Sequence, residues 1–206
     1  MAIVINGSGT VTGLAVGGLP DGTVDAGTLA ANSVDSTELI NGAIDASHLA
    51  SGVGGKLLQV VQLFKTDDTT FASNSSWADI SGYTQNITPS ASTSKVLVTL
   101  SINAGTPNLA YIRIIRDSTE IASGGASGSR VHHAVGPFAN TGDSARSYNF
   151  GVEFLDSPST TNAVTYKLQG YCETGNTLYF NRSQGDSNND TGWRNPSSIT
   201  LKEIGA

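Results

Sequence analysis

A polar loop near the C-terminus holds the residues whose types are best suited to binding a ligand. Residues 183–194 are rich in Asp, Asn, Ser and Gly, and they end in Trp193 and Arg194. A flat aromatic ring packs against the apolar face of a sugar, while amides and carboxylates hydrogen-bond to its hydroxyl groups. The segment therefore predicts glycan contact through eight residues: Tyr179, Arg182, Asp186, Asn188, Asn189, Asp190, Trp193 and Arg194.

Two other interpretations of this loop stay open. In the first, it is a solvated hairpin loop whose Trp193 packs back onto the domain. In the second, Asp186 and Asp190 hold Ca²⁺, but the twelve-position calcium loop with its terminal Glu is missing. We therefore expect no metal and no other cofactor. Residues 140–143 form a second, weaker candidate surface.

The sequence shows no set of catalytic residues, and we do not expect an enzyme. His132 and His133 fall in an expected strand, so their rings would point to opposite faces and would not share a metal. The Gly-x-Ser-x-Gly nucleophile motif is missing. Glycoside cleavage needs two acids at a fixed separation, so a polysaccharide-cleaving enzyme is the least favoured hypothesis. Four acids are candidates by residue type alone: Asp143, Glu153, Asp156 and Glu173.

The strands that must position this loop are expected between residues 56 and 206. Apolar residues there recur at period two in short runs, which Ser, Thr, Asn and Gly clusters separate. The expected strands are 57–65, 77–80, 83–87, 95–104, 110–116, 120–122, 130–135, 147–155, 163–172, 177–181 and 198–203. No segment has a helical period. The pattern predicts an all-β head, a β-sandwich of jelly-roll type.

Three side chains of this head carry separate expectations. Trp77 stands beside a strand start and the apolar Ile80, so we expect it in the core. Arg113 and Arg116 interrupt an otherwise apolar strand. We expect the two arginines at a seam between chains or at the edge of a sheet.

A ten-residue repeat fills residues 21–50. In three consecutive copies the fourth position is Val or Ile, the fifth is Asp and the ninth is Leu. A single chain has nothing against which to bury these apolar side chains, whereas three chains around one axis would bury them in layers. The repeat therefore predicts a homotrimeric stalk, and the alternative interpretation is a solvated linker. The expected stalk core is Val24, Leu29, Val34, Leu39, Ile44 and Leu49.

Composition excludes several classes of partner. The net charge of −6 argues against nucleic acid, because phosphate contacts need a basic face. No apolar stretch approaches the roughly 18 residues of a membrane span, so we expect no membrane insertion. No signal peptide is recognisable, which fits assembly in a cytoplasm followed by release on lysis. Cys172 is the single cysteine, so no disulfide forms within the chain.

The order and spacing of several short motifs resemble a domain at the ends of tail-fibre and related virion proteins of marine and cyanobacterial phages. The motifs are residues 76–82 (SWADISG), 87–90 (ITPS), 94–98 (SKVLV), 113–117 (RIIRD), 156–158 (DSP), 164–166 (VTY), 181–183 (NRS) and 198–204 (SITLKEI). The repeat of residues 21–50 is also similar to repeats that precede such heads. The resemblance covers nearly the whole chain.

This resemblance implies a phage virion protein, a homotrimeric tail fibre whose head adheres to polysaccharide on the host surface. The expected order is a Gly-rich attachment segment at residues 1–20, the stalk at 21–50, a Gly-rich hinge at 51–55 and the head at 56–206. The attachment segment would bind phage tail or capsid proteins. The alternative is a capsid fibre or decoration protein without a specific receptor. Either protein would be assembled in the host cytoplasm and exposed on the outside of the virion.

Overall fold

The computed structural model describes residues 4–5, 11–12, 44, 48, 56–73, 75–106, 108–138, 146–190 and 192–205. The chain divides into two units, Met1–Gly54 and Gly55–Ala206. In the first unit, β1 (Val4–Ile5) pairs antiparallel with β2 (Val11–Thr12).

Most of the predicted attachment segment, stalk and hinge lies outside the described residues. Of the expected stalk core, Ile44 is described, and its side chain is exposed. Five members of that core lie outside the described residues: Val24, Leu29, Val34, Leu39 and Leu49. The stalk therefore stays a prediction, and residues 140–143 also lie outside the described part of the head.

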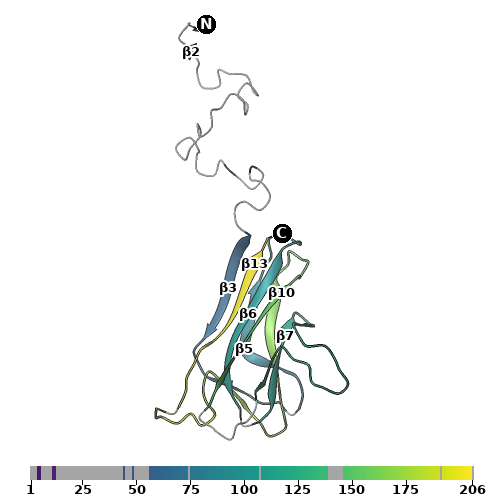
Figure 1. Cartoon of the computed structure of the whole chain (residues 1–206), viewed down its shortest axis with the longest axis vertical. Helices are drawn as coiled ribbons and strands as arrows, with labels where there is room; N and C mark the ends of the chain where they lie inside the picture. Colours follow the sequence, from purple (N-terminus) through teal and green to yellow (C-terminus); the bar gives the residue numbers. More distant parts are fainter. Residues whose placement is uncertain are drawn as a thin grey trace. The chain divides into compact units, whose positions relative to one another are not determined.

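The second unit is built from two antiparallel sheets, which confirms the predicted all-β class (Figure 1). In the first sheet, β6 lies between β13 and β10, β3 lies beyond β13, and β12 and β4 continue the sheet beside the end of β6. Its strands are β3 (Leu57–Lys65), β4 (Thr69–Phe71), β6 (Lys95–Gly105), β10 (Tyr148–Asp156), β12 (Leu178–Phe180) and β13 (Ser197–Ile204).

In the second sheet, β11 lies between β5 and β7, and both β8 and β9 pair with the other edge of β7. Its strands are β5 (Ala78–Ile87), β7 (Ala110–Arg116), β8 (Thr119–Ile121), β9 (Val135–Phe138) and β11 (Val164–Cys172). Among the residues described, no helix is long and apolar enough to cross a membrane.

The core is formed by one side of each sheet, as a β-sandwich-like fold requires. Buried residues alternate with half-buried ones along β11, and β6 repeats this alternation over most of its length. Alternate side chains of a strand point to opposite faces, so the period-two pattern in the sequence marks the core side. The largest fully buried side chains include Tyr83, Phe138, Tyr166 and Phe180.

Three expected strands differ from the observed ones. The two segments 77–80 and 83–87 belong to one strand, β5, which is interrupted by Gly82 at φ +79° and by a register shift against β11. The expected strand 130–135 is wrong, because residues 130–134 form a loop and β9 begins at Val135. The three-residue strand β4 was not predicted, because its apolar pattern is too short to recognise.

The structure also changes the expectations for Trp77, Arg113 and Arg116. Trp77 is half-buried rather than in the core, and the Arg113 guanidinium lies 4.5 Å from the centre of its ring. Both arginines belong to β7, which has neighbours along both edges and is therefore not a sheet edge. Arg116 instead forms an ion pair with Asp156 of the other sheet, with 2.7 Å between Nη1 and Oδ1.

Candidate ligand-binding pocket

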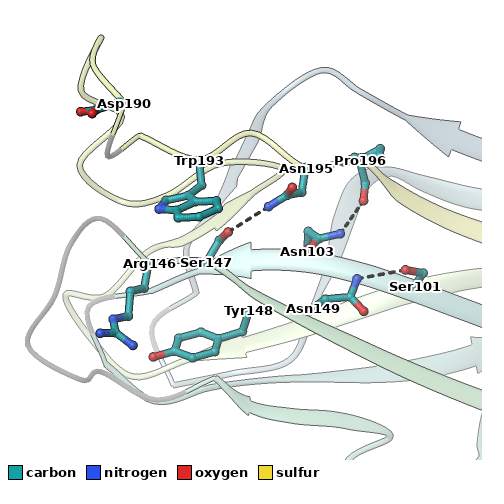
Figure 2. A pocket seen from close by; sticks show the side chains of 10 residues that line it. All are labelled: Ser101, Asn103, Arg146, Ser147, Tyr148, Asn149, Asp190, Trp193, Asn195 and Pro196. Atoms are coloured by element: carbon teal, nitrogen blue, oxygen red, sulfur yellow. Dashed lines mark hydrogen bonds between the residues drawn. The ribbon is translucent and has the colours of Figure 1, made fainter.

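A cavity of about 1170 Å³ opens where the first sheet meets the loop between β12 and β13 (Figure 2). Three segments that are far apart in the sequence line it: the end of β6, the start of β10 and the loop that ends at β13. The lining residues are Ser101, Asn103, Arg146, Ser147, Tyr148, Asn149, Asp190, Trp193, Asn195 and Pro196.

Strand register fixes which end of the head carries the pocket. Lys95 of β6 lies opposite Ile204 of β13, and the backbone of Gly205 hydrogen-bonds to Lys56, the first residue before β3. Ser101 and Asn103 lie further along β6, in the direction away from these contacts. The pocket is therefore at the opposite end of the first sheet from the point where the head begins.

The hydrogen-bonding groups of the pocket are held by short contacts. The Asn103 side chain donates from Nδ2 to the carbonyl of Pro196 at 2.5 Å, and its backbone N donates to Ser197 Oγ at 2.9 Å. Asn149 Nδ2 donates to Ser101 Oγ at 3.0 Å, which couples β10 to β6 (Figure 2). Amides oriented in this way offer their remaining acceptor and donor positions in fixed directions.

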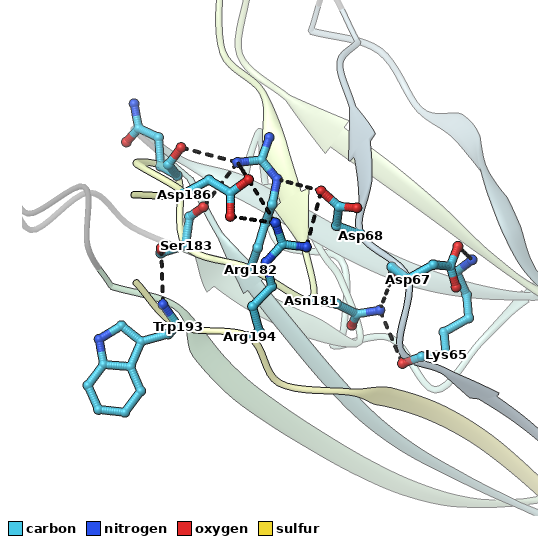
Figure 3. Close-up of polar contacts among 10 residues, drawn as sticks. Lys65, Asp67, Asp68, Asn181, Arg182, Ser183, Asp186, Trp193 and Arg194 are labelled. Atoms are coloured by element: carbon cyan, nitrogen blue, oxygen red, sulfur yellow. Dashed lines mark hydrogen bonds and ion pairs between the residues drawn. The ribbon is translucent and has the colours of Figure 1, made fainter. Parts of the chain in front are cut away.

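Trp193 combines an anchored backbone with an exposed ring. Ser183 N donates to Trp193 O at 3.0 Å, and Trp193 N donates to the buried Ser183 Oγ at 3.4 Å (Figure 3). The side chain is nevertheless 56% exposed and lines the pocket, so it does not pack back onto the domain. An exposed aromatic on a held backbone is available to a ligand without rearrangement of the loop.

The start of the loop is fixed by Asn181, which has φ +59° and is buried. Its Nδ2 donates to the carbonyls of Lys65 and Asp67 (Figure 3). Its Oδ1 accepts from Ser197 Oγ at 2.6 Å. Asn tolerates this left-handed backbone better than most residues. Asn181 thus joins the end of β12 to the start of β13 and to the turn after β3.

Three of the predicted glycan residues pair with one another instead of facing the pocket. Arg194 Nη2 donates to both carboxylate oxygens of Asp186, at 2.7 and 2.9 Å. Arg182 and Arg194 both approach Asp68 Oδ2, at 3.3 and 3.6 Å (Figure 3). The Arg182 guanidinium also lies 4.5 Å from the centre of the Tyr179 ring. This cluster braces the loop, and its two cations already pair with the Asp186 carboxylate.

The structure therefore divides the eight predicted contact residues. Asp190 and Trp193 line the pocket, and Asn188 and Asn189 are exposed in the loop. The remaining four residues contribute to the brace around Asp68, namely Tyr179, Arg182, Asp186 and Arg194. Contact with a glycan stays a prediction for all eight.

Sequence reasoning missed the wall of the pocket that the sheet provides. Ser101, Asn103 and Asn149 point to the outer side of the first sheet, as the alternation of buried residues in β6 and β10 indicates. The sequence does contain a signal for this wall, because polar residues occupy every second position at the end of β6. Which loop they face depends on strand pairing, which the sequence pattern does not contain.

Among the described residues, no three or more His, Cys, Asp or Glu side chains form a group that could hold a metal. His132 and His133 are in a loop, not a strand; His132 Nδ1 is 3.1 Å from Glu120 Oε1, and the His133 ring packs on Tyr111 at 4.7 Å. Of the acids considered, Asp156 is buried in its ion pair and Glu173 accepts a hydrogen bond from Asn108. Glu153 is exposed on β10, and Asp143 lies outside the described residues.

Comparison with known proteins gives no family for this chain. No protein-family model matches the sequence, and no curated protein matches it. One solved structure with a similar chain is that of infectious bursal disease virus, Gx strain, with 14% sequence identity and a TM-score of 0.35. The match covers 72% of this chain and 37% of that one, so the chain spans little more than a third of its neighbour's length. This similarity is too low to support an argument about fold or function.

Proposed function

We propose that this chain is a phage virion fibre protein whose head binds glycans on the host surface. The observation that carries the proposal is the pocket, where the exposed Trp193 ring stands beside oriented amide and hydroxyl groups of β6 and β10. This combination matches the two halves of sugar recognition, stacking and hydrogen bonding. The position of the pocket, at the far end of the sheet from Lys56, suits a head that points away from the virion.

The order of the strands supports a jelly roll as the fold of the head. The first sheet runs β3-β13-β6-β10 and the second β5-β11-β7-β8, so the first and last strands of the head are neighbours. Successive strands alternate between the two sheets for much of the chain. Such an order is characteristic of two interlocked Greek keys, the arrangement of jelly-roll domains.

The proposed protein is a homotrimer that acts by adhesion and not by catalysis. Three heads would present three pockets to one surface, and avidity would make weak individual contacts effective. Asp190 is the one acid among the described residues that line the pocket, whereas cleavage of a glycosidic bond uses two. The N-terminal segment would attach to tail or capsid proteins, and the head would be exposed on the outside of the virion.

Replacing Trp193 with Ala tests the glycan proposal. We expect at least a tenfold loss of affinity for host surface polysaccharide, since the ring supplies the apolar contact and burial of such a side chain is worth about 1.5–3 kcal/mol. Binding would be measured on a panel of purified bacterial capsular and lipopolysaccharide glycans. Trp193→Phe should retain part of the affinity, and Val131→Ala, an exposed apolar residue outside the pocket, should retain all of it. Equal binding by the Trp193→Ala protein would refute the proposal.

Replacing Gly105 with Ala tests the geometry of the pocket walls. A Cβ atom at this position would lie 2.8 Å from Arg146 O and 3.2 Å from Gln184 N, both of them backbone atoms. We expect the start of β10 and the loop to move apart, with a loss of about 1–3 kcal/mol in the free energy of unfolding and weaker glycan binding. Gly124→Ala is the matched control, because nothing lies within 4 Å of its Cβ position.

One observation favours the second candidate, a capsid fibre or decoration protein without a receptor. The brace of Arg182, Asp186 and Arg194 around Asp68 uses charges that a receptor site would otherwise offer to a ligand. Antibody labelling of virions would distinguish the two candidates. Label on the tail together with glycan binding supports the first candidate, whereas label on the capsid without glycan binding supports the second.

A further inference from the structure

We infer that the outer side of the β3-β13-β6-β10 sheet is the surface through which copies of this chain associate. The inference rests on the proposed fibre function for the expectation that three copies assemble. It adds where on the head they meet.

Exposed apolar side chains concentrate on this sheet. Five of the eight large apolar side chains that are exposed among the described residues belong to it: Leu57, Leu58, Val60, Phe64 and Leu155. Val60, Phe64 and Leu155 are 51%, 59% and 46% exposed. Single exposed apolar residues are ordinary, but a group of them on one sheet marks an interaction surface.

Strand register places two of these residues, Val60 and Leu155, in one row. Val60 lies opposite Lys202, Lys202 lies opposite Leu97, and Leu97 lies opposite Leu155. Directly opposed residues share a face of the sheet, so the row crosses all four strands with three apolar side chains and the aliphatic stem of one lysine. The core is on the other side, where Val61 and Leu201 point.

The neighbouring rows are formed mostly by small residues. One consists of Phe64, Ser198, Ser101 and Gly151, and the next of Gln62, Thr200, Thr99 and Glu153. Small side chains let another backbone approach closely. The same side of the sheet carries Lys95, Lys202 and Glu153, so copies that meet there bring charges of both signs together.

The sequence before β3 identifies the occupant as another copy of this chain. The ten-residue repeat ends at residue 50, and residues 51–56 separate it from Leu57, the first residue of β3. Six residues reach at most about 20 Å. If three repeats share an axis, the three β3 strands must begin close to it, at high effective concentration. β3, the first strand after the repeat in the sequence, carries four of the five exposed apolar residues of this sheet.

This surface and the pocket can operate together. The row that contains Val60 and Leu155 lies toward the end of the sheet where Lys56 meets Gly205, and the pocket opens at the other end. Association through this row leaves Trp193 accessible. The row of Phe64 is the limit of the association surface on the pocket side, because it contains Ser101, which also lines the pocket.

Light scattering on the full-length protein tests the inference. We expect the native chain to have three times its mass of 21.2 kDa, and the double variant Val60→Glu, Leu155→Glu to have the mass of one chain. Val131→Glu makes the same chemical change at an exposed apolar residue of the loop before β9 and should remain trimeric. A monomeric native protein, a trimeric double variant or a monomeric Val131→Glu protein would each overturn the inference.

Thiol labelling gives a second measurement that does not require a charged substitution. Leu155→Cys in the full chain should react with a maleimide at least tenfold more slowly than Val131→Cys. The native Cys172 does not interfere, because it is fully buried and burial raises its pKa to about 11. Equal rates at the two positions would count against this surface.

Glycan binding by the same samples separates this inference from the proposed function. If the protein is a trimer that is protected at position 155 but binds no glycan, the association surface is supported and the proposed glycan-binding function is refuted. If the protein is a monomer that binds glycan and loses this binding with Trp193→Ala, the glycan-binding function is supported and the association surface is refuted. Protection at position 155 in a monomeric native protein would show that residues 1–55 of the same chain cover the sheet, which also overturns the inference.

Discussion

Replacing Asp156 with Ala is expected to lower the free energy of unfolding of the head by about 3 kcal/mol. The carboxylate is 5% exposed and lies at the end of β10 in the first sheet. It accepts hydrogen bonds from Arg116 Nη1 and from Tyr166 OH, both at 2.7 Å and both from the second sheet. Removal of the carboxylate leaves a cation and a buried hydroxyl without their acceptor, and it removes a link between the sheets.

Urea denaturation would measure this effect. The protein concentration is held constant, because the proposed association would stabilise the folded state. Asp156→Asn keeps an acceptor for one donor and should cost less than Asp156→Ala. Asp79→Ala is the control, because Asp79 is half-exposed and pairs with Lys167 at 2.7 Å on the surface, where such pairs contribute about 0–1 kcal/mol. An Asp156→Ala protein that is no less stable than Asp79→Ala would contradict the role assigned to the carboxylate.

Four of the longer strands were predicted well from their short apolar runs. The bounds of β3 and β7 were predicted to the residue, and the expected ends of β10 and β11 were within one residue. The segment 130–135 has a similar alternation, but its residues pair with β7 only from Val135 onward. An alternating pattern shows that a segment could form a strand of a sheet. Whether the segment does so depends on whether the edge of a neighbouring strand is free to pair with it.

Only the part of the pocket that the loop between β12 and β13 forms could be predicted from the sequence. Trp193 and Asp190 were found because aromatic and acidic residues in a long polar loop suggest ligand contact. The opposite wall depends on the pairing of Asn149 with Asn103, which are far apart in the sequence. Likewise, nothing in the residue types shows that Arg194 would turn to Asp186 rather than to a ligand.

Several motifs on which the phage-fibre resemblance rests have structural roles. Asp156 links the two sheets, Asn181 joins two strands of the first sheet, and Glu203 holds the segment that contains Ser90. These residues support the head and do not line the pocket. In the proposed function, these motifs would support the architecture of the head, and the choice of receptor would depend on pocket residues outside them, such as Trp193.

The ionised carboxylate of Glu203 stabilises the folded head, and this contribution is lost at acidic pH. The side chain is 0% exposed, and its carboxylate accepts from Gln59 Nε2 at 2.8 Å and from the backbone N and hydroxyl of Ser90 at 2.7 and 2.6 Å. Burial alone would raise the pKa of Glu203, but the hydrogen bonds from Gln59 and Ser90 outweigh it and lower the pKa from 4.5 to about 2. Because the folded-state pKa is the lower one, this contribution is present above pH 4.5 and is lost as the pH falls toward 2.

Glu203→Gln is therefore expected to lower the free energy of unfolding by about 2 kcal/mol at pH 7, because a neutral amide places an N–H group where the carboxylate accepted hydrogen bonds. Other acids also titrate, so the informative quantity is the difference between the native protein and the variant. That difference should be largest at pH 7 and should shrink steadily between pH 4.5 and pH 2 in urea titrations. Glu173→Gln, which alters an acid bonded to Asn108 at the surface, should change stability little at pH 7. A difference for Glu203→Gln that stays constant down to pH 2 would show that the carboxylate packs against Ser90 without stabilising the fold through its charge.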